Sequence, residues 1–413
     1  MKIFQLCDEW RNGGAENVFS ATVDLLSELG SHEIVPIYAG KPNLKWSRSF
    51  ILGNSENSRL FEKIPIYSME NFKAITNRLK EEKVDIIHLH GIFSKLTPSV
   101  LCAIKNLKKY KKFKLVETVH SYTMVCPNGP LYSYSAEQVC NKCVGQKIKT
   151  GIFHNNCDRR GWAFSCGKGL RSLILNNLIG HANIVDKFIA PSEFMRQKLI
   201  CEGIDGRKIE VIRNPANLLE SESVGDFSKK DEIIYFGRFS PEKNLNLLIE
   251  AFSILINDSR FLNYRLKLIG DGESSNEIKE LVCRFSISER VDIFGFLSGS
   301  KLWQEVGTAK IFVLPSKCYE NAPLSIVEAS LLSVIPVVSN IGGISELQKL
   351  LGVGDVFESN NVEDLVRVIK KVLSNYLSYF RFMQERNSEI KNIFDRRNYA
   401  NKLSELYESV LRS

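Results

Sequence analysis

Short apolar runs alternate with longer segments of helical periodicity along most of the 413-residue chain. A short apolar run predicts a buried strand, and apolar positions spaced three and four apart predict a helix that covers it. Repeated alternation of this kind is typical of α/β proteins with parallel sheets. The predicted strands occupy residues 1–6, 33–38, 84–89, 114–118 and 187–190, and then residues 232–236, 265–269, 291–294, 311–314 and 335–339.

The strands fall into two groups, which predict two Rossmann-like domains. The polar segment 218–230 lies between the groups and reads as a linker. We expect an N-terminal domain at 1–217, a C-terminal domain at 231–394, and a final helix at 395–413 that returns to the first domain. Because ligands of open parallel sheets bind at the carboxyl ends of the strands, we expect the two sheets to face one central cleft.

One segment, 123–169, interrupts the alternation with many Gly, Asn and Ser residues, and a loop of this length needs its own explanation. Four of its cysteines have the spacing C-x13-C-x2-C-x13-C, and the central C-x2-C is common in tetrahedral zinc sites. A structural zinc ion is therefore expected, with free thiols as the alternative. Cys166 or His154 could replace one ligand. The four expected ligands are Cys126, Cys140, Cys143 and Cys157.

Composition places the chain among ordinary globular proteins, with 44% hydrophobic and 25% charged residues. No apolar run is long enough to span a membrane. The N-terminus runs directly into Asp8 and Glu9, which does not fit a signal peptide. We therefore expect a cytoplasmic protein, in which disulfides are disfavoured.

A net charge of +8 predicts an anionic partner, and nucleic acid, anionic lipid and phosphorylated metabolites all qualify. The basic run at 105–114 reads most simply as the solvated end of a helix, with contact to a membrane surface as the alternative.

Two glycines, Gly13 and Gly14, follow the first predicted strand and precede an amphipathic helix. Glycine lets the backbone approach a ligand, and a helix N-terminus attracts phosphate. A pair of glycines is also common in ordinary tight turns. The pair alone therefore indicates little.

Stronger signals follow strands of the second half. Gly237 begins a turn that carries Arg238 and Lys243, two cations that could converge on a diphosphate. Glu320 and Glu328 lie eight residues apart across a loop and the start of a helix, where Glu328 could accept hydrogen bonds from the two ribose hydroxyls.

The order of these motifs resembles the retaining glycosyltransferases of family 4, which have the GT-B architecture. The resemblance covers nearly the whole chain, and the joint order is far more specific than any one motif. The matching motifs are Gly13-Gly14-Ala15-Glu16, the VDIIHLHG strand at 84–91, Thr118-Val119-His120, Ala190-Pro191-Ser192-Glu193, Asn214-Pro215, Gly237-Arg238 with Lys243, Gly270-Asp271-Gly272, the pair Glu320 and Glu328, and Gly342-Gly343 with Glu346.

The resemblance implies a role for each matching residue. Arg238 and Lys243 correspond to the diphosphate clamp, Glu328 to the ribose ligand, and Glu320 to a carboxylate near the donor sugar. His120 corresponds to an active-site histidine that binds a donor-sugar hydroxyl.

It also implies further donor contacts. The amides of Leu324 and Ser325 would touch phosphate, whereas Pro323 has no amide to offer. Phe296 stands at a position that, in this family, often borders the base of the nucleotide. Core packing is the alternative.

The implied reaction is transfer of a hexosyl group from a UDP- or GDP-sugar with retained configuration. The chain has no Asp-x-Asp pair, so protein cations would stabilise the leaving diphosphate and no catalytic cofactor is expected. The expected acceptor is a polyprenyl-diphosphate-linked glycan of surface polysaccharide synthesis, such as lipopolysaccharide O-antigen, and no nucleic acid partner is expected. The alternatives are a sugar-nucleotide 2-epimerase of GT-B shape and a non-catalytic scaffold subunit.

A lipid-linked acceptor would require peripheral docking at the inner face of the cell membrane. Residues 162–184 combine Trp162 and Phe164 with Lys168 and Arg171, and aromatic rings beside cations suit an anionic bilayer surface. Core packing is the alternative for 173–184, so the Trp162 end and the 105–114 run are the preferred docking sites.

Overall fold

The computed structural model describes residues 1–9, 13–40, 43, 46, 49–52, 67–92, 95–216 and 227–413. It divides the chain into two compact units. The first contains Met1–Pro215 together with Arg396–Ser413, and the second contains Ala216–Asp395. Most of the expected linker, 218–226, lies outside the described residues, as do residues 10–12 of the first glycine turn.

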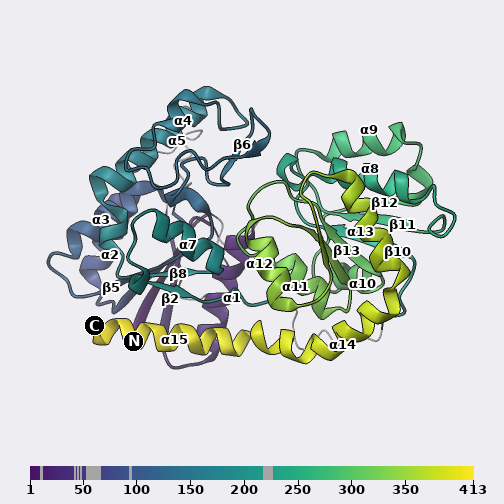
Figure 1. Cartoon of the computed structure of the whole chain (residues 1–413). Coiled ribbons are helices and arrows are strands. Elements are labelled where there is room, and N and C mark those ends of the chain that lie inside the picture. Colours follow the sequence, from purple (N-terminus) through teal and green to yellow (C-terminus); the bar gives the residue numbers. More distant parts are fainter. Residues whose placement is uncertain are drawn as a thin grey trace. The chain divides into compact units, whose positions relative to one another are not determined.

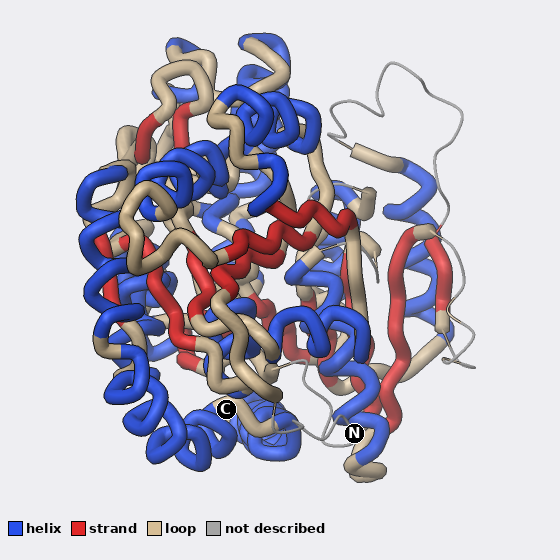
Figure 2. Tube along the Cα trace, turned by 90° about the vertical axis from the view of Figure 1, so that its right-hand side faces the viewer, coloured by secondary structure: helices blue, strands red, loops and turns tan. Residues whose placement is uncertain are grey.

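In its described part, the first unit is built on a parallel sheet of order β3-β2-β1-β4-β5-β8-β9. Helices (blue in Figure 2) flank strands (red). The strands are β1 (Lys2–Cys7), β2 (Glu33–Ala39), β3 (Phe50–Leu52), β4 (Ile86–Leu89), β5 (Lys114–Thr118), β8 (Lys187–Ala190) and β9 (Ile209–Val211). The longer helices are α1 (Gly14–Glu28), α2 (Met69–Glu81), α3 (Thr97–Leu107), α5 (Trp162–Leu173), α7 (Glu193–Cys201) and α15 (Arg396–Arg412).

The second unit repeats the plan with a parallel sheet of order β12-β11-β10-β13-β14-β15 in its described part. The strands are β10 (Glu232–Phe236), β11 (Arg265–Ile269), β12 (Val291–Gly295), β13 (Ile311–Leu314), β14 (Ile335–Ser339) and β15 (Asp355–Phe357). The helices are α8 (Leu245–Leu255), α9 (Ser275–Arg284), α10 (Ser300–Gly307), α11 (Leu324–Leu331), α12 (Gly342–Leu351), α13 (Val362–Ser374) and α14 (Tyr376–Ile393).

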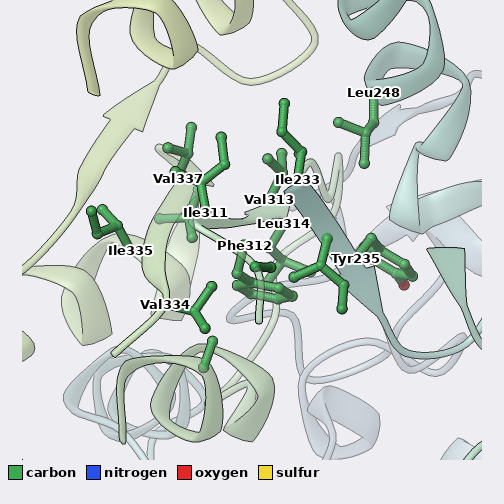
Figure 3. Close-up of a cluster of buried hydrophobic side chains, with 14 of the residues drawn as sticks. Ile233, Tyr235, Leu248, Ile311, Phe312, Val313, Leu314, Val334, Ile335 and Val337 are labelled. Carbon is green, nitrogen blue, oxygen red and sulfur yellow. The ribbon is translucent and has the colours of Figure 1, made fainter. Parts of the chain in front are cut away.

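The core of the second unit explains why β10, β13 and β14 are almost entirely apolar. Figure 3 shows side chains of β10, β13 and β14 gathered with Leu248 of α8. Tyr235 and Phe312 are fully buried there. A strand covered on both faces needs apolar residues at every position, and each large side chain buried in this way contributes roughly 1.5–3 kcal/mol.

The last helix of the chain, α15, belongs to the first unit (Figure 1). Its apolar stripe is buried, and it packs against α1, where the hydroxyls of Tyr399 and Thr22 lie 2.8 Å apart. The C-terminal residues therefore contribute to the same core as the first strands of the chain.

The segment rich in cysteine is an ordered insertion between β5 and β8. It contains the short hairpin β6 (Tyr132–Ser133) and β7 (Gln138–Val139), the helix α4 (Gly151–His154), and then α5. A π-helical segment (Ile174–Ile179) and α6 (His181–Ile184) lead into β8. Within the described ranges, no helix is long and apolar enough to cross a bilayer.

Candidate functional site

Three glycines shape the loops that follow β10 and β11 in the second unit. Gly270 has φ +145°, and a Cβ atom there would lie 1.9 Å from the carbonyl oxygen of Gly237. A Cβ atom on Gly272 would lie 2.2 Å from the carbonyl oxygen of Phe239. The two loops thus pack backbone against backbone, which requires glycine and fixes the turn that carries Arg238 and Lys243.

Lys243 forms an ion pair with Glu320 across this edge of the sheet, with 2.7 Å between Nζ and Oε2. The Ser316 hydroxyl donates to the other carboxylate oxygen of Glu320. Burial alone would lower the pKa of Lys243, but the negative charge of Glu320 outweighs it and the pKa is raised. Lys243 therefore stays cationic, with its charge largely balanced by Glu320.

Arg238 lies close to this pair but differs from Lys243 in its environment. It is exposed and forms no ion pair within the described parts of the chain. Burial raises the pKa of Tyr235, on which the charges of Lys243, Glu320 and Arg238 also act, so the three are gathered around one tyrosine. The Tyr235 hydroxyl donates to the Arg238 carbonyl oxygen over 2.8 Å and holds the turn. Arg238 thus offers an unbalanced positive charge.

The loop after β13 is held against the start of α12. The amide of Gly343 donates to the Glu320 carbonyl oxygen over 3.0 Å, and a Cβ atom on Gly343 would lie 2.0 Å from the Asn321 carbonyl oxygen. Glycine at 343 therefore allows the close approach that positions Glu320.

Helix α11 begins directly after this loop. Its N-cap residue, Pro323, makes no side-chain hydrogen bond to the first turn, which contains Leu324 and Ser325. Free amides and the helix dipole make such a terminus suitable for an anion. Glu328 follows one turn later and is buried, with 6% exposed.

Phe296 is 78% exposed, so it does not pack in the core as the alternative interpretation required. It follows β12 directly, and its role beside a base stays a prediction.

In the first unit, a pocket of about 310 Å³ lies at the carboxyl ends of β1, β4 and β5. His120, the histidine that the resemblance assigns to the active site, is among the residues that line it. Ala15 and Glu16 of α1 form another part of the wall, directly after Gly13 and Gly14. Packing does not require glycine at position 14, because no atom lies within 4 Å of the place that a Cβ atom would occupy there.

Arg171 of α5 also lines this pocket, although the sequence suggested a membrane-facing role for it. Burial lowers its pKa, and it interacts electrostatically with Asp8, another lining residue. Asp8 is itself anchored, because one of its oxygens accepts the amides of Lys95 and Leu96 over 2.9 and 2.7 Å. The insertion thus contributes a cation to the pocket, which no motif signals.

A chain of hydrogen bonds runs from His120 into the core of the first unit. His120 Nε2 lies 3.2 Å from His90 Nδ1, and His90 Nε2 lies 2.9 Å from Gln5 Oε1. Gln5 Nε2 donates to the Tyr407 hydroxyl over 3.0 Å. That hydroxyl lies 2.6 Å from His88 Nδ1, and His88 Nε2 lies 2.8 Å from Thr118 Oγ1. We call this set the histidine chain: His120, His90, Gln5, Tyr407, His88 and Thr118.

The histidines of this chain are neutral in the folded protein. Burial lowers the pKa of His88 to about 3 and that of His120 to about 4. Burial, assisted by the charges of its two neighbours, lowers the pKa of His90 well below its usual value. Every link is therefore a hydrogen bond between neutral groups.

The structure gives no support for the zinc site that the cysteine spacing predicts. Across the described ranges, no group of three or more His, Cys, Asp or Glu side chains could hold a metal ion. Burial and neighbouring thiols raise the pKa of Cys143 to about 11 and that of Cys157 to about 12. Cys126 is also buried and Cys140 is partly exposed.

Polar contacts hold the insertion. Asp158 binds Arg160 and Lys168, at 3.0 and 2.8 Å. Lys149 pairs with Glu202 of the neighbouring helix end and donates to the Cys143 carbonyl oxygen over 2.8 Å. The loop is therefore ordered by interactions that its cysteine spacing did not indicate.

Two family models match the chain. The model described as Glycosyltransferase Family 4 matches residues 12–218, half of the chain. The model described as Glycosyl transferases group 1 matches residues 219–392. The chain belongs to these glycosyltransferases.

Individual relatives are distant but cover most of the chain. A 41.2 kDa protein in the cps region of Klebsiella pneumoniae is 22% identical over 99% of this chain and 100% of its own. An Escherichia coli enzyme named UDP-Gal:alpha-D-GlcNAc-diphosphoundecaprenol alpha-1,3-galactosyltransferase is 24% identical over 83% of this chain and 80% of its own.

Among solved structures, Anabaena HepE in complex with UDP-glucose has a TM-score of 0.68 at 17% identity, covering 99% of this chain and 100% of its own. A glycosyltransferase from Rickettsia africae has a TM-score of 0.69 at 19% identity, covering 100% and 99%. These matches confirm the GT-B fold class, and the family models confirm the predicted resemblance. The individual site roles stay predictions.

The lowered pKa values of the histidine chain predict a loss of stability in mild acid. In the unfolded chain a histidine takes up a proton near pH 6.5, whereas His88, His90 and His120 cannot do so until the pH is far lower. The unfolded state therefore binds more protons below pH 6.5, and stability, complete above that pH, falls as the pH drops.

Urea unfolding at pH 7.0 and pH 5.5 measures this effect, because few carboxylates titrate in that window. We expect a lower free energy of unfolding at pH 5.5, and a smaller fall in the His88→Gln variant. Equal stability at the two pH values would contradict the neutral assignment.

Proposed function

We propose that the protein transfers a hexosyl group from a nucleoside-diphosphate sugar, with retained configuration and without a catalytic metal, to a lipid-linked glycan in surface polysaccharide synthesis. The observation that carries this proposal is the second-unit site: an exposed, unpaired Arg238 and the Lys243–Glu320 pair gathered around Tyr235, on loops that follow β10 and β13. The names of the E. coli relative and of the HepE complex support a UDP-sugar and a diphosphate-lipid acceptor.

Arg238 suits stabilisation of the leaving diphosphate. A free guanidinium binds phosphate oxygens in a bidentate manner, and the uncapped N-terminus of α11 offers further donors. Lys243 can add its charge by moving between Glu320 and a phosphate. Negative charge on the leaving group grows during bond breaking, so these groups favour the transition state over the bound donor.

Glu320 is better suited to hold Lys243 than to attack the sugar. One of its oxygens binds Lys243 and the other accepts the Ser316 hydroxyl, which lowers its nucleophilicity. We therefore favour a front-side displacement. The bond between the anomeric carbon and the phosphate oxygen breaks, the acceptor oxygen bonds to that carbon on the same face, and the acceptor proton passes to the leaving phosphate.

The acceptor is assigned to the first unit, where Arg171 and Asp8 line one pocket together with His120, the residue proposed to bind a hydroxyl of the donor sugar. Guanidinium, carboxylate and imidazole groups all form hydrogen bonds with sugar hydroxyls. Nucleoside-diphosphate release, measured with and without acceptor, tests the function. Acceptor-dependent release supports a transferase, while an epimerase would convert the donor alone and a scaffold subunit would do neither.

The first prediction from this proposal concerns Arg238. Arg238→Ala should lower turnover by about 10- to 100-fold, because a charge-assisted hydrogen bond contributes roughly 1.5–3 kcal/mol. Lys243→Ala and Glu328→Ala should weaken donor binding, measured by titration with UDP and GDP.

Lys310→Ala is the matched control. Lys310 has the same side-chain exposure as Lys243, 21%, and pairs with Asp231 at the opposite, amino-terminal edge of the same sheet. The control should keep wild-type turnover. If Arg238→Ala had wild-type kinetics, Arg238 would not stabilise the leaving diphosphate.

A membrane-docking role is proposed for the basic segment that follows α3. The lysines proposed to contact lipid are those that the fold leaves exposed. Lys108 is not available for lipid, because it binds Asp186 and the Ile184 carbonyl oxygen at 2.5 and 2.6 Å. Lys109 and Lys112 are exposed, and Tyr110 between them is 86% exposed. An exposed aromatic ring between two lysines suits an anionic lipid surface.

Lys109→Glu combined with Lys112→Glu should weaken binding to anionic liposomes by at least 10-fold, since each basic side chain contributes about 1 kcal/mol near the surface. Binding should also fall with added salt. Liposome co-sedimentation provides the measurement. The control, Lys279→Glu with Lys349→Glu, makes the same charge change at two exposed lysines of the second unit. An equal loss in both variants would rule out a specific docking surface.

Zinc stays a prediction from the cysteine spacing alone. Protein purified without chelator should then carry about one zinc per chain, lost on changing Cys140 and Cys143 to serine. Cys201 and Cys283, two exposed cysteines outside the insertion, provide the control pair. Metal-free protein with a folded insertion would show that its polar contacts suffice.

A further inference from the structure

The direction of each hydrogen bond in the histidine chain can be deduced from the amide of Gln5. Gln5 Nε2 donates to the Tyr407 hydroxyl, so the single proton of that hydroxyl is free to go to His88 Nδ1. A neutral His88 that accepts at Nδ1 carries its proton on Nε2 and donates it to Thr118. This half of the chain therefore runs from Gln5 toward Thr118.

The other half follows from the oxygen of the same amide. Gln5 Oε1 can only accept, so His90 must donate from Nε2 and leave Nδ1 without a proton. His90 Nδ1 then accepts from His120 Nε2. A neutral His120 that is protonated on Nε2 has a free lone pair on Nδ1, and no described residue bonds to that atom.

We propose that Tyr407, on the C-terminal helix α15, is a positioning residue that holds His120 as the Nε2-protonated tautomer, so that Nδ1 accepts a hydrogen bond from a hydroxyl of the sugar bound in the first-unit pocket. The part that concerns the sugar rests on the proposed function. The tautomer assignment does not, because it follows from the hydrogen bonds of the unliganded protein.

Tyr407 has this role because the hydrogen bonds of the histidine chain have a second consistent arrangement. If the Gln5 amide turned over, its nitrogen would donate to His90, its oxygen would accept from Tyr407, and every link would reverse. His120 would then carry its proton on Nδ1 and could no longer accept from a hydroxyl there. In the observed arrangement the Tyr407 hydroxyl accepts from Gln5 and donates to His88, and so it couples the orientation of the amide to the tautomer of His88.

The test is the tautomer of each histidine, read from two-bond nitrogen–proton NMR correlations in the unliganded, full-length protein. The chain has six histidines, so the spectrum can be assigned with single His→Gln variants. We expect His88, His90 and His120 all to be protonated on Nε2. In Tyr407→Phe the Gln5 amide loses its hydroxyl partner, and His120 should populate both tautomers.

Helix α15 supplies a matched control. Tyr399 is also fully buried against the first unit, and its hydroxyl makes one hydrogen bond, to Thr22. Tyr399→Phe removes the same atom from the same helix without touching the histidine chain. Both variants should lose thermal stability to a similar extent, but only Tyr407→Phe should change the His120 tautomer.

Kinetics then connect the tautomer to substrate. Tyr407→Phe should lower kcat/KM by about 5- to 10-fold, the effect of one neutral hydrogen bond worth about 1 kcal/mol, whereas Tyr399→Phe should keep the wild-type value. A wild-type His120 protonated on Nδ1, or a tautomer unchanged in Tyr407→Phe, overturns the assignment. A tautomer shift without loss of kcat/KM overturns only the contact with sugar, and a wild-type protein that transfers no sugar overturns the proposed function while leaving the NMR result intact.

Discussion

Parallel strands covered on both faces determine where polar groups can lie in this protein. In such a sheet a polar side chain in mid-strand has no water to bind, so it must find a partner inside the core or be excluded. In the second unit the polar groups of the proposed site follow β10 and β13 or lie at the start of α11, whereas Lys267, which is buried within β11, pairs with Glu232 at 2.8 Å. In the first unit, Gln5 on β1 and His88 on β4 lie directly opposite each other in mid-strand and find their partners inside the core.

The buried polar groups of the histidine chain are tolerated because they bind one another. His88 binds Tyr407 and Thr118 with its two nitrogens, and Gln5 binds His90 and Tyr407 with its amide. An unpaired buried polar group costs roughly 1–3 kcal/mol, so the loss of one member leaves its neighbours unsatisfied as well. The network thereby ties the last helix of the chain to its first strand, over a sequence separation of 402 residues.

The sequence predicted the fold well because the fold depends on local periodicity. All ten predicted strands are present, and the short strands that it missed, such as β9 and β15, lie at sheet edges or carry three residues. The second-unit site was also readable, since its residues follow strands in family-like motifs. The Lys243–Glu320 contact, the role of Lys108 in binding Asp186, and the place of Arg171 in the pocket depend on tertiary packing that no spacing encodes. Likewise Tyr407 belongs to none of the motifs that the sequence offers.

The Lys243–Glu320 pair shows how an unliganded site can keep a charge ready for a ligand. A partly buried ammonium without a counter-ion would lose hydration without compensation and would tend to release its proton. Glu320 prevents this, and Ser316 in turn satisfies the second carboxylate oxygen. A diphosphate brings its own negative charge, so in the proposed site it can replace Glu320 as the partner of Lys243 at little electrostatic cost, while Arg238 meets it with a charge that no described residue balances. In the proposed site Glu320 thus keeps Lys243 charged until a ligand takes its place, and Arg238 adds a second positive charge for the leaving diphosphate.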